Sequence, residues 1–349
     1  MSHKNHIEGV IRLSTPMHCA MPGDKIKDAS PTMQISIVTG SGKETMPFFP
    51  GNDLRGRLRR KAAAIVMPAL VSEGGKLPLD LYAGLTCGAS DASPENELSI
   101  EEALRYSKNV YMGIFGGGKR LLRSRFSVQD LIPITQSTIH NGLVPSKYEM
   151  LEEGWAPIDH AWKLIDHLNM TRVDDIMHVV RPDEIEANVA NSHAAVAEYQ
   201  AFHLGTSATR KEEKKAKVSD DVKTKKTDVA NMMKIQVIPA GTPMYFRMDF
   251  NDQVTDAQVG LMLQSLEALV NEQALGGWCR IGLGKYNITE MNLVRNGERM
   301  PVFTEENKEE IGYQLNPMLA KIHAEPAAME VAALTVADML SYFKHSKGE

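Results

Sequence analysis

Positively charged side chains are concentrated in a stretch that follows a Pro-Gly turn near the start of the chain. Residues 47–66 read PFFPGNDLRGRLRRKAAAIV. Apolar residues recur there at helical spacing, which predicts one buried stripe formed by Leu54, Leu58, Ala62 and Ile65. The cations fall on the two flanks of this stripe: Arg55 and Arg59 on one, and Arg57, Arg60 and Lys61 on the other. A polyanion is the partner that such a helix would attract.

The backbone at the start of this helix offers a second source of positive potential. Asn52 is expected to cap the helix, and Asp53 suits the positive end of its dipole. The N–H groups of the first turn are a predicted anion site. Because Arg55 and Arg59 flank the buried stripe and do not fill it, we expect reversal of both charges to leave the fold intact.

A second basic segment surrounds a run of three glycines, and its cations are Lys119, Arg120, Arg123 and Arg125. Residues 113–120 read GIFGGGKR, which differs from the phosphate-binding loop G-x4-G-K-S/T in its last position. Arg120 stands where that loop has the hydroxyl group that binds magnesium. The segment therefore does not favour an NTPase.

The composition is that of a globular protein with segregated charge. The chain has 349 residues, of which 43% are hydrophobic, a formal net charge of -5 and a pI of about 6.1. Cations gather at 55–61, 119–125 and 210–226, and acidic residues gather at 91–102, 149–159 and 305–310. The net charge argues mildly against a free nucleic-acid binder, whereas the segregation indicates a polyanion on one face.

Cysteine usage and hydropathy bear on the compartment. Cys19, Cys87 and Cys279 form no CxxC pair, which suits a reduced cytoplasm and predicts neither a disulfide nor a metal site. No apolar run is long enough to span a membrane, and the first eight residues are polar. We therefore expect a cytoplasmic protein.

Hydrophobic periodicity predicts two similar halves. Strands at 6–15 and 33–39 precede the basic helix, and strands at 233–238 and 244–250 precede an amphipathic helix at 256–274. Gly276 and Gly277 are expected to end that helix. This order favours an α+β fold with a ferredoxin-like βαββαβ core that is split by an insertion.

The segments between and after the two halves are less regular. Residues 110–115 could form a strand or a buried turn, residues 123–130 alternate as a strand, and residues 155–168 have helical character. An alanine-rich helix is expected at 182–202, and the C-terminal helix at 334–343. The lysine-rich segment 206–226 has almost no apolar residues and is expected to be mobile when free.

Four segments, taken in order, resemble the motifs of the RAMP (repeat-associated mysterious protein) subunits of CRISPR complexes. Residues 50–59 (PGNDLRGRLR) resemble Pro-Gly-Ser-Ser-Leu-Lys/Arg-Gly-x-x-Arg, and residues 115–130 resemble the segment from Phe-Gly to Ser-Arg-hydrophobic-x-hydrophobic-x-Asp. Residues 238–244 (IPAGTPM) resemble Val-Pro-x-Gly-Thr-x-Phe, and residues 276–284 (GGWCRIGLG) resemble a glycine-rich loop. Each pattern is weak alone, but their order is specific. The chain looks most like a Cas-seven-type backbone subunit of type IV.

The resemblance implies an RRM-like palm, inserted fingers and a thumb. The corresponding ranges are 1–70 and 232–300 for the palm, 71–134 for the fingers, 135–231 for the thumb and lysine-rich segment, and 301–349 for a C-terminal helical extension. Copies of such a subunit stack head to tail along a CRISPR guide RNA, with other effector subunits and a complementary target nucleic acid as further partners. Because guide sequences vary, the contacts are expected to use backbone and shape.

Residues carried over from these motifs form the expected RNA-binding site. They are Asn52, Arg55, Arg59, Lys119, Arg120, Arg123, Arg125, Gly277, Arg280, Gly282 and Gly284. Glycine lets the backbone approach phosphates closely, and arginine supplies contacts that are independent of base sequence. We expect no enzymatic activity, catalytic residue, metal or cofactor.

Two enzymatic alternatives remain open at the level of sequence. Type III relatives cleave target RNA with an aspartate in the loop after the first strand, and here the loop at 17–32 offers Asp24 and Asp28. Aspartate is also common in turns, so Pro22-Gly23-Asp24 alone does not indicate catalysis. A guide-processing ribonuclease would need a general base, for which His18 is the nearest candidate.

Overall fold

The structure is a computed structural model that describes residues 5–23, 29–40, 42–71, 75–88, 90–91, 99–119, 122–151, 155–171, 232–304 and 312–343. The chain forms two compact units, residues 1–167 with 236–349, and residues 168–235. Strands β8 (Asp166–Thr171) and β9 (Met232–Val237) pair with each other. The helix expected at 182–202 and the lysine-rich segment 206–226 lie outside the described residues.

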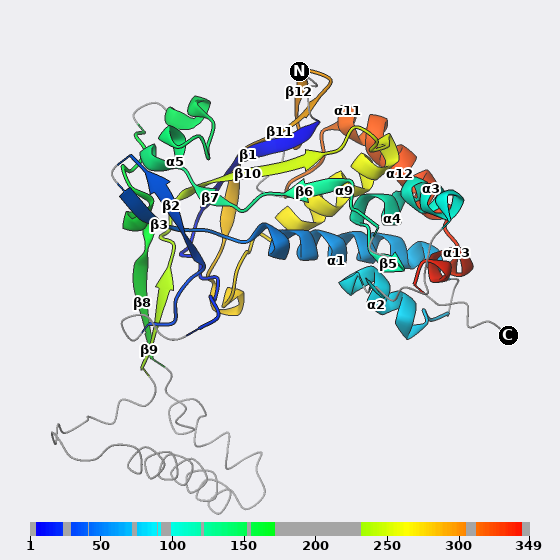
Figure 1. The fold of residues 1–349 in the computed structure, drawn as a ribbon, viewed down its shortest axis with the longest axis horizontal. Coiled ribbons are helices and arrows are strands. Elements are labelled where there is room, and N and C mark those ends of the chain that lie inside the picture. The colour runs from blue at the N-terminus through cyan, green and yellow to red at the C-terminus, as the bar shows by residue number, and fades with distance from the viewer. Residues whose placement is uncertain are drawn as a thin grey trace, which may run out of the picture. The chain divides into compact units, whose positions relative to one another are not determined.

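An antiparallel sheet of six strands, counted within the described residues, organises the first unit (Figure 1). Its strands lie in the order β12 (Glu298–Pro301), β11 (Tyr286–Arg295), β1 (His6–Leu13), β10 (Pro243–Phe250) and β6 (Phe126–Val128), with β7 (Ile132–Pro133) also paired to β10. At the centre, Gly9 lies opposite Phe246 and Met291. A Cβ on Gly9 would lie 2.2 Å from Glu290 O, so glycine is required for this close approach.

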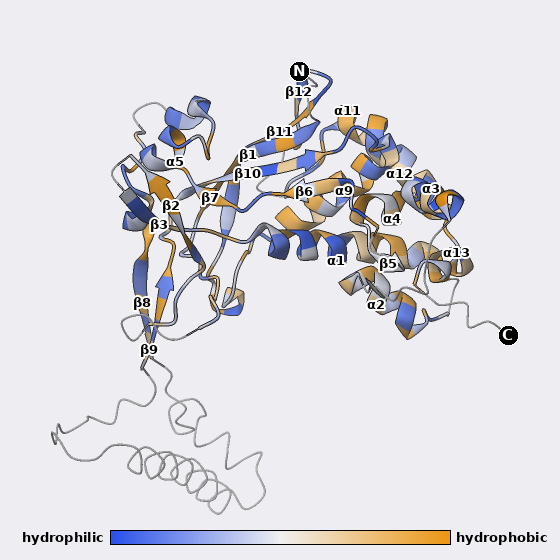
Figure 2. Ribbon diagram, in the orientation of Figure 1, coloured by the Kyte–Doolittle hydropathy of each residue, from blue (hydrophilic) through white to orange (hydrophobic). Residues whose placement is uncertain are grey.

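Helices α1 (Gly51–Leu70) and α9 (Asp256–Val270) lie against one face of this sheet (Figure 1). Ile7 and Ile11 of β1 share a buried core with Leu58 of α1 and Leu263 of α9. Apolar residues are concentrated where the helices meet (Figure 2). Along the chain the order is β1, α1, β6, β10, α9, β11. The prediction of an α+β protein is therefore confirmed.

Among the described residues, the remaining helices are short, and several of them pack on α1 and α9. They are α2 (Leu79–Cys87), α3 (Ile100–Lys108), α4 (Val110–Phe115), α5 (Gln136–His140), α11 (Pro317–Leu319), α12 (Glu325–Ala332) and α13 (Val336–Ser341). Shorter 3-10 or π-helical turns lie at Ser146–Glu149, Ala161–Leu164, Cys279–Ile281 and Ala320–Ala324. In the part of the chain that the structure describes, no helix has the length and apolar character needed to cross a membrane.

Two small pairings complete the fold. Strands β2 (Gln34–Thr39) and β3 (Gly42–Pro47) form a hairpin, and β4 (Ser90–Asp91) pairs in parallel with β5 (Gly118–Lys119). The strands expected at 33–39, 233–238 and 244–250 are confirmed. The second strand of the hairpin was missed because Gly42–Pro47 lacks an alternating apolar pattern.

The segment 110–115 is helix α4, so the prediction of a strand or turn is wrong. Asn109 is the reason, because its side chain accepts hydrogen bonds from Tyr111 N and Met112 N and thereby caps a helix. All six residues of α4 are buried, which removes the periodicity that a half-exposed helix would show.

Two further predictions of helix boundaries are wrong. The segment 155–168 contains a 3-10 turn and then the start of β8; Ile158 and Trp162 are 43% and 52% exposed, so its apolar residues do not form one buried helical face. Helix α9 ends at Val270 with Asn271 as its cap, five or more residues before Gly276 and Gly277. Those glycines belong to the following loop, where a Cβ on Gly276 would lie 2.4 Å from His18 O.

Candidate nucleic-acid interface

Helix α1 begins directly after Pro50, and its first N–H group is already occupied. Pro50 is the N-cap residue and makes no side-chain capping bond, while Asn52 lies inside the first turn and is exposed. Gly51 N donates to Asp130 Oδ1 at 2.7 Å. The predicted Asn52 cap is therefore wrong. The chain's own Asp130 carboxylate takes an N–H group that was expected to face an external anion.

One flank of α1 faces the end of α4. Arg55 Nη2 donates to Phe115 O at 2.9 Å, and Arg59 Nη2 donates to Phe115 O at 2.8 Å and Gly116 O at 3.1 Å. The Arg59 guanidinium also lies 5.4 Å from the centroid of the Phe115 ring. Carbonyls at a helix end lack partners within the helix and carry partial negative charge, which these two cations satisfy. Arg59 is only 6% exposed, so the expectation that both cations lie outside the buried stripe is wrong for Arg59.

The other flank of α1 faces the second glycine-rich loop, residues 276–284. Arg57 Nη2 donates to Gly276 O at 3.2 Å, and Arg57 Nε donates to Asp53 Oδ2 at 3.1 Å. One turn further on, Lys61 forms an ion pair with Glu272, which follows α9. Helix α1 thus joins three of the four segments that carry the motifs.

The glycines of the second loop have different roles. Gly276 and Gly284 have φ values of 86° and 76°, and a Cβ on Gly284 would lie 1.8 Å from Leu275 O. Gly277 N donates to His18 O at 2.7 Å, which anchors the start of the loop. Gly282 also has a positive φ, 90°, but nothing lies within 4 Å of a Cβ built there. The space on the Cβ side of Gly282 is therefore open, although its N–H donates to Cys279 O at 3.0 Å and its carbonyl accepts from Thr15 Oγ1 at 2.8 Å.

Arg125 is a framework residue in this structure. It is 9% exposed, and its Nη1 donates to Gln253 O at 2.7 Å and Gln258 Oε1 at 3.0 Å. Burial lowers the pKa of Arg125, and burial together with the charge of Arg59 lowers the pKa of Arg55. Arginine nevertheless stays cationic at neutral pH.

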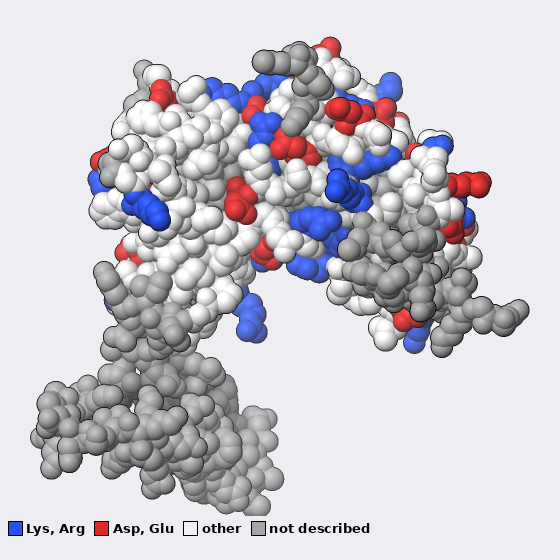
Figure 3. Space-filling view, viewed as in Figure 1, with Lys and Arg blue, Asp and Glu red and all other residues white. Residues whose placement is uncertain are grey.

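The predicted site residues that are exposed are Asn52, Arg123 and Arg280. Arg60, the residue after Arg59 on α1, is exposed as well. The structure describes the backbone of Lys119 in β5 but not its side chain, and Arg120 lies outside the described residues. Figure 3 shows Lys and Arg side chains gathered at the middle of one face, over α1 and next to it. This basic surface is what the arrangement offers to a polyanion.

The residues considered for catalysis give a different result. Asp24 and Asp28 lie outside the described residues. His18 is 2% exposed, and its Nδ1 lies 2.7 Å from Gln236 O, whereas a general base must reach the proton that it removes. Within the described residues, no three His, Cys, Asp or Glu side chains lie together as a metal site would require.

A buried charge cluster on the sheet face opposite α1 and α9 was missed by sequence reasoning. The Glu8 side chain is 7% exposed and accepts a hydrogen bond from Lys147 Nζ, with Arg299 Nη1 at 3.2 Å and Arg247 Nη1 at 3.9 Å. Burial alone would raise the pKa of Glu8, but the hydrogen bond and charge of Lys147, with the charges of His6 and Arg299, hold it below its usual value. These partners come from distant segments, so sequence spacing could not reveal them.

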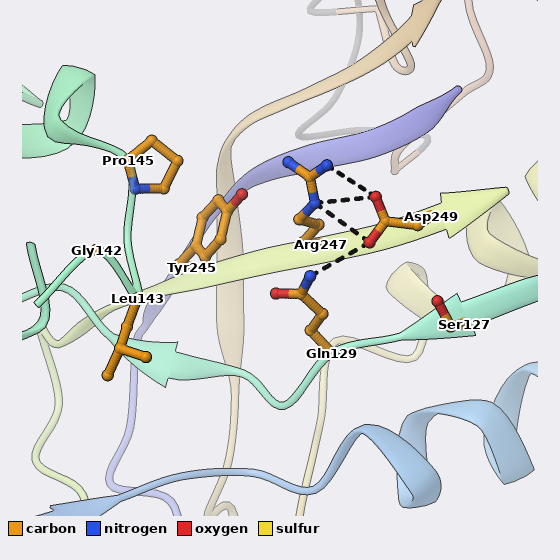
Figure 4. Close-up of a pocket in the computed structure, with 8 residues that line it drawn as sticks. All are labelled: Ser127, Gln129, Gly142, Leu143, Pro145, Tyr245, Arg247 and Asp249. Atoms are coloured by element: carbon orange, nitrogen blue, oxygen red, sulfur yellow. Dashed lines mark hydrogen bonds and ion pairs between the residues drawn. The ribbon is translucent and has the colours of Figure 1, made fainter. Parts of the chain in front are cut away.

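A pocket of about 420 Å³ lies next to this cluster (Figure 4). It is lined by Ser127, Gln129, Gly142, Leu143, Pro145, Tyr245, Arg247 and Asp249. Arg247 Nη2 lies 2.8 Å from Asp249 Oδ1, and Gln129 Nε2 donates to Asp249 Oδ2 at 3.2 Å, as Figure 4 shows. The polar groups of the pocket are therefore largely paired with each other. The alternation of Tyr245, Arg247 and Asp249 along β10 was the one sequence signal for a polar sheet face.

Comparisons with known proteins find a likeness in structure. The chain matches no family model, and no curated protein matches its sequence. Among solved structures, a chain described as "Type IV-B CRISPR Complex" is similar, with 14% sequence identity and a TM-score of 0.46 over 84% of this chain and 92% of that chain.

Proposed function

We propose that this protein is a backbone subunit that binds a guide RNA through its phosphates and stacks in copies along it, in a type IV-like CRISPR effector complex. The observation that carries the proposal is the meeting of three motif segments at α1. Arg55 and Arg59 tie the Pro-Gly segment to Phe115–Gly116, and Arg57 ties it to Gly276. Residues far apart in sequence that resemble one family's motifs are thus neighbours in space.

The arrangement of the sheet supports an RRM-like palm within this proposal. Six elements, with others inserted between them, come in the chain order strand, helix, strand, strand, helix, strand: β1, α1, β6, β10, α9 and β11. Their strands lie side by side in the order β11, β1, β10, β6, and all pairs are antiparallel. This is the order of a split βαβ sandwich of the ferredoxin-like kind.

The proposed division of labour follows burial. Arg59 and Arg125 are positioning residues, because they are buried and bound to carbonyl or amide oxygens. Arg60, Arg123 and Arg280 are exposed and are the proposed phosphate contacts. Gly282 leaves steric space next to Arg280, because nothing lies within 4 Å of a Cβ built there. Contacts of this kind are independent of base sequence.

The test is the salt dependence of binding to single-stranded RNA of mixed sequence. Each phosphate contact contributes about -0.7 to the slope of log affinity against log salt, so three contacts predict a slope of about -2. Arg60→Glu, Arg123→Glu and Arg280→Glu should each weaken binding and make the slope less steep by about 0.7. Lys43→Glu is the matched control, because Lys43 is exposed on the β2–β3 hairpin. Affinity that does not change with salt would contradict the proposal.

Assembly along RNA is tested separately by size. A backbone subunit should form large RNA-containing particles on gel filtration, together with other effector subunits and a complementary target strand when these are supplied. A guide-processing ribonuclease should stay small and release short products. Particles that do not grow with RNA length would contradict stacking along the guide.

The proposal includes the absence of target cleavage by this subunit. The assembled complex should be incubated with matched target RNA and a divalent metal ion. Intact target is the expected result. Regularly spaced products that disappear in Asp24→Ala or Asp28→Ala would instead identify a target-cleaving subunit of type III character.

A further inference from the structure

Trp278 is held in an unusual backbone conformation and is exposed. Its φ and ψ are 63° and 20°, in the left-handed region that large side chains rarely adopt. The residue is 42% exposed, and its neighbour Ile281 is 58% exposed. A strained aromatic residue that stays 42% exposed is not explained by packing of the core alone.

The loop that carries Trp278 is anchored at both ends, so the ring is presented by a defined backbone. Gly277 N donates to His18 O at 2.7 Å, and Gly284 N donates to Pro16 O at 2.8 Å. Cys279 Sγ lies 3.2 Å from Gly276 O, inside the loop. These bonds hold the residues on both sides of Trp278.

Among the described residues, the positive charge next to the ring in sequence that no ion pair offsets is that of Arg280. Arg280 is exposed two residues further on, and Arg57 binds the carbonyl of Gly276, two residues before the ring. The nearby carboxylates are already paired: Asp53 binds Arg57, and Glu272 binds Lys61. A ligand at this ring would therefore meet an apolar aromatic face beside uncompensated positive charge.

We propose that Trp278 is a stacking platform for one nucleobase of single-stranded RNA, with Arg280 on the adjacent phosphate. This inference rests on the proposed function and names a contact within it. Every base has a π face, so stacking on an aromatic ring is independent of sequence, as a variable guide requires. An anionic backbone matches Arg280, and an apolar peptide partner would not use that charge.

The affinity test uses a matched pair of tryptophans in the full-length protein. Trp278→Ala should weaken binding to single-stranded RNA by about 5- to 150-fold, the range for loss of one stacked base. Trp278→Phe should retain most of the affinity. Trp162→Ala is the control, because Trp162 is 52% exposed but already stacks on His160, and it should bind RNA normally.

A second variant separates the ring from the backbone strain. Trp278→Gly removes the side chain but tolerates the left-handed conformation, so the loop should keep its shape. It should lose RNA affinity as Trp278→Ala does while remaining folded by circular dichroism. Normal RNA affinity of Trp278→Gly would overturn the inference.

Fluorescence gives a direct readout of contact with a base. In a variant with Trp155→Phe and Trp162→Phe, Trp278 is the sole tryptophan, since the sequence contains three. Its emission should be quenched by RNA oligonucleotides and much less by an abasic chain of equal length. Equal quenching by the two would indicate a phosphate contact without stacking and would overturn the inference.

The outcomes distinguish this inference from the proposed function. RNA binding with the expected salt slope, unaffected by Trp278→Ala, would overturn the stacking site and leave the proposed function in place. Failure of the wild-type protein to bind RNA at low salt would overturn the proposed function itself. Loss of self-association in Trp278→Ala without RNA, at unchanged RNA affinity, would identify a protein contact and also overturn the stacking site.

Discussion

Replacement of Arg59 by alanine should destabilise the fold, although arginine on a helix is usually a surface residue. The Arg59 side chain is 6% exposed and donates to Phe115 O and Gly116 O at 2.8 and 3.1 Å. Its guanidinium carbon lies 5.4 Å from the Phe115 ring centroid, and a Cβ on Gly88 would lie 2.7 Å from that carbon. The group therefore fills a closed site between α1, α2 and α4.

The magnitude follows from what Arg59→Ala removes. A hydrogen bond to a charged group contributes about 1.5–3 kcal/mol, and a cation over an aromatic ring about 0.5–2 kcal/mol. Phe115 O keeps its bond from Arg55 at 2.9 Å, so the carbonyl left without a partner is that of Gly116. The wild-type fold also bears the cost of removing the Arg59 cation from water, and Arg59→Ala is free of this cost, which offsets part of the loss. We expect a net destabilisation of about 3 kcal/mol.

The assay is thermal or urea unfolding of Arg59→Ala beside Arg60→Ala. At about 2–4 °C per kcal/mol, the melting temperature of Arg59→Ala should fall by about 6–12 °C. Arg60 is exposed on the same helix, so its alanine variant should change stability by less than about 0.5 kcal/mol. Equal stability of the two variants would refute a structural role for Arg59.

Three more predictions concern the glycine loop, the buried carboxylate and the cysteines. Gly284→Ala should lower the free energy of unfolding by about 3 kcal/mol or more, because its Cβ would overlap a carbonyl oxygen. Gly282→Ala has open space around its Cβ and should lower it by only about 1 kcal/mol, for its positive φ. Urea unfolding of the two variants compares these losses. The pKa of Glu8 is lowered in the fold, so its contribution is present above its ordinary pKa of 4.5 and is lost as pH falls through the folded value. Glu8→Gln should therefore be less stable at pH 7 and show a smaller loss of stability in acid, measured by unfolding at both pH values. Burial raises the pKa of Cys19 to about 11, so a thiol reagent at pH 8 should modify exposed Cys87 first, as peptide mass spectrometry would show.

The sequence could predict elements whose signals are local. The strands at 34–39 and 243–250 were found from strict alternation, and α1 from its apolar spacing after Pro50. The error at 110–115 has a physical cause, because a short helix buried on every side shows no periodicity. There the cap at Asn109 was the better signal.

Sheet order and the buried charge cluster depended on contacts between distant segments. Glu8 on β1 meets Lys147 and Arg299, which are 139 and 291 residues away in sequence. No spacing rule links such positions, so a lone glutamate in a strand reads as a surface residue. Its burial is decided by partners that only the folded sheet brings together.

The number of cations on α1 is a poor guide to RNA binding, because most of them are engaged within the protein. Of its five cations, Arg55 and Arg59 bind the carbonyls that end α4, Arg57 binds Gly276 O, and Lys61 binds Glu272. The partners of these cations lie between 56 and 219 residues away in sequence. Helical spacing within α1 cannot reveal them, so from sequence every cation is assigned to the surface. Most of the cations on α1 therefore bind groups of the protein itself, at Phe115–Gly116 and in the loop 276–284. Phosphate contacts in the proposed site then depend on its one exposed arginine, Arg60, and on Arg123 and Arg280 beside the loops that the helix holds in place.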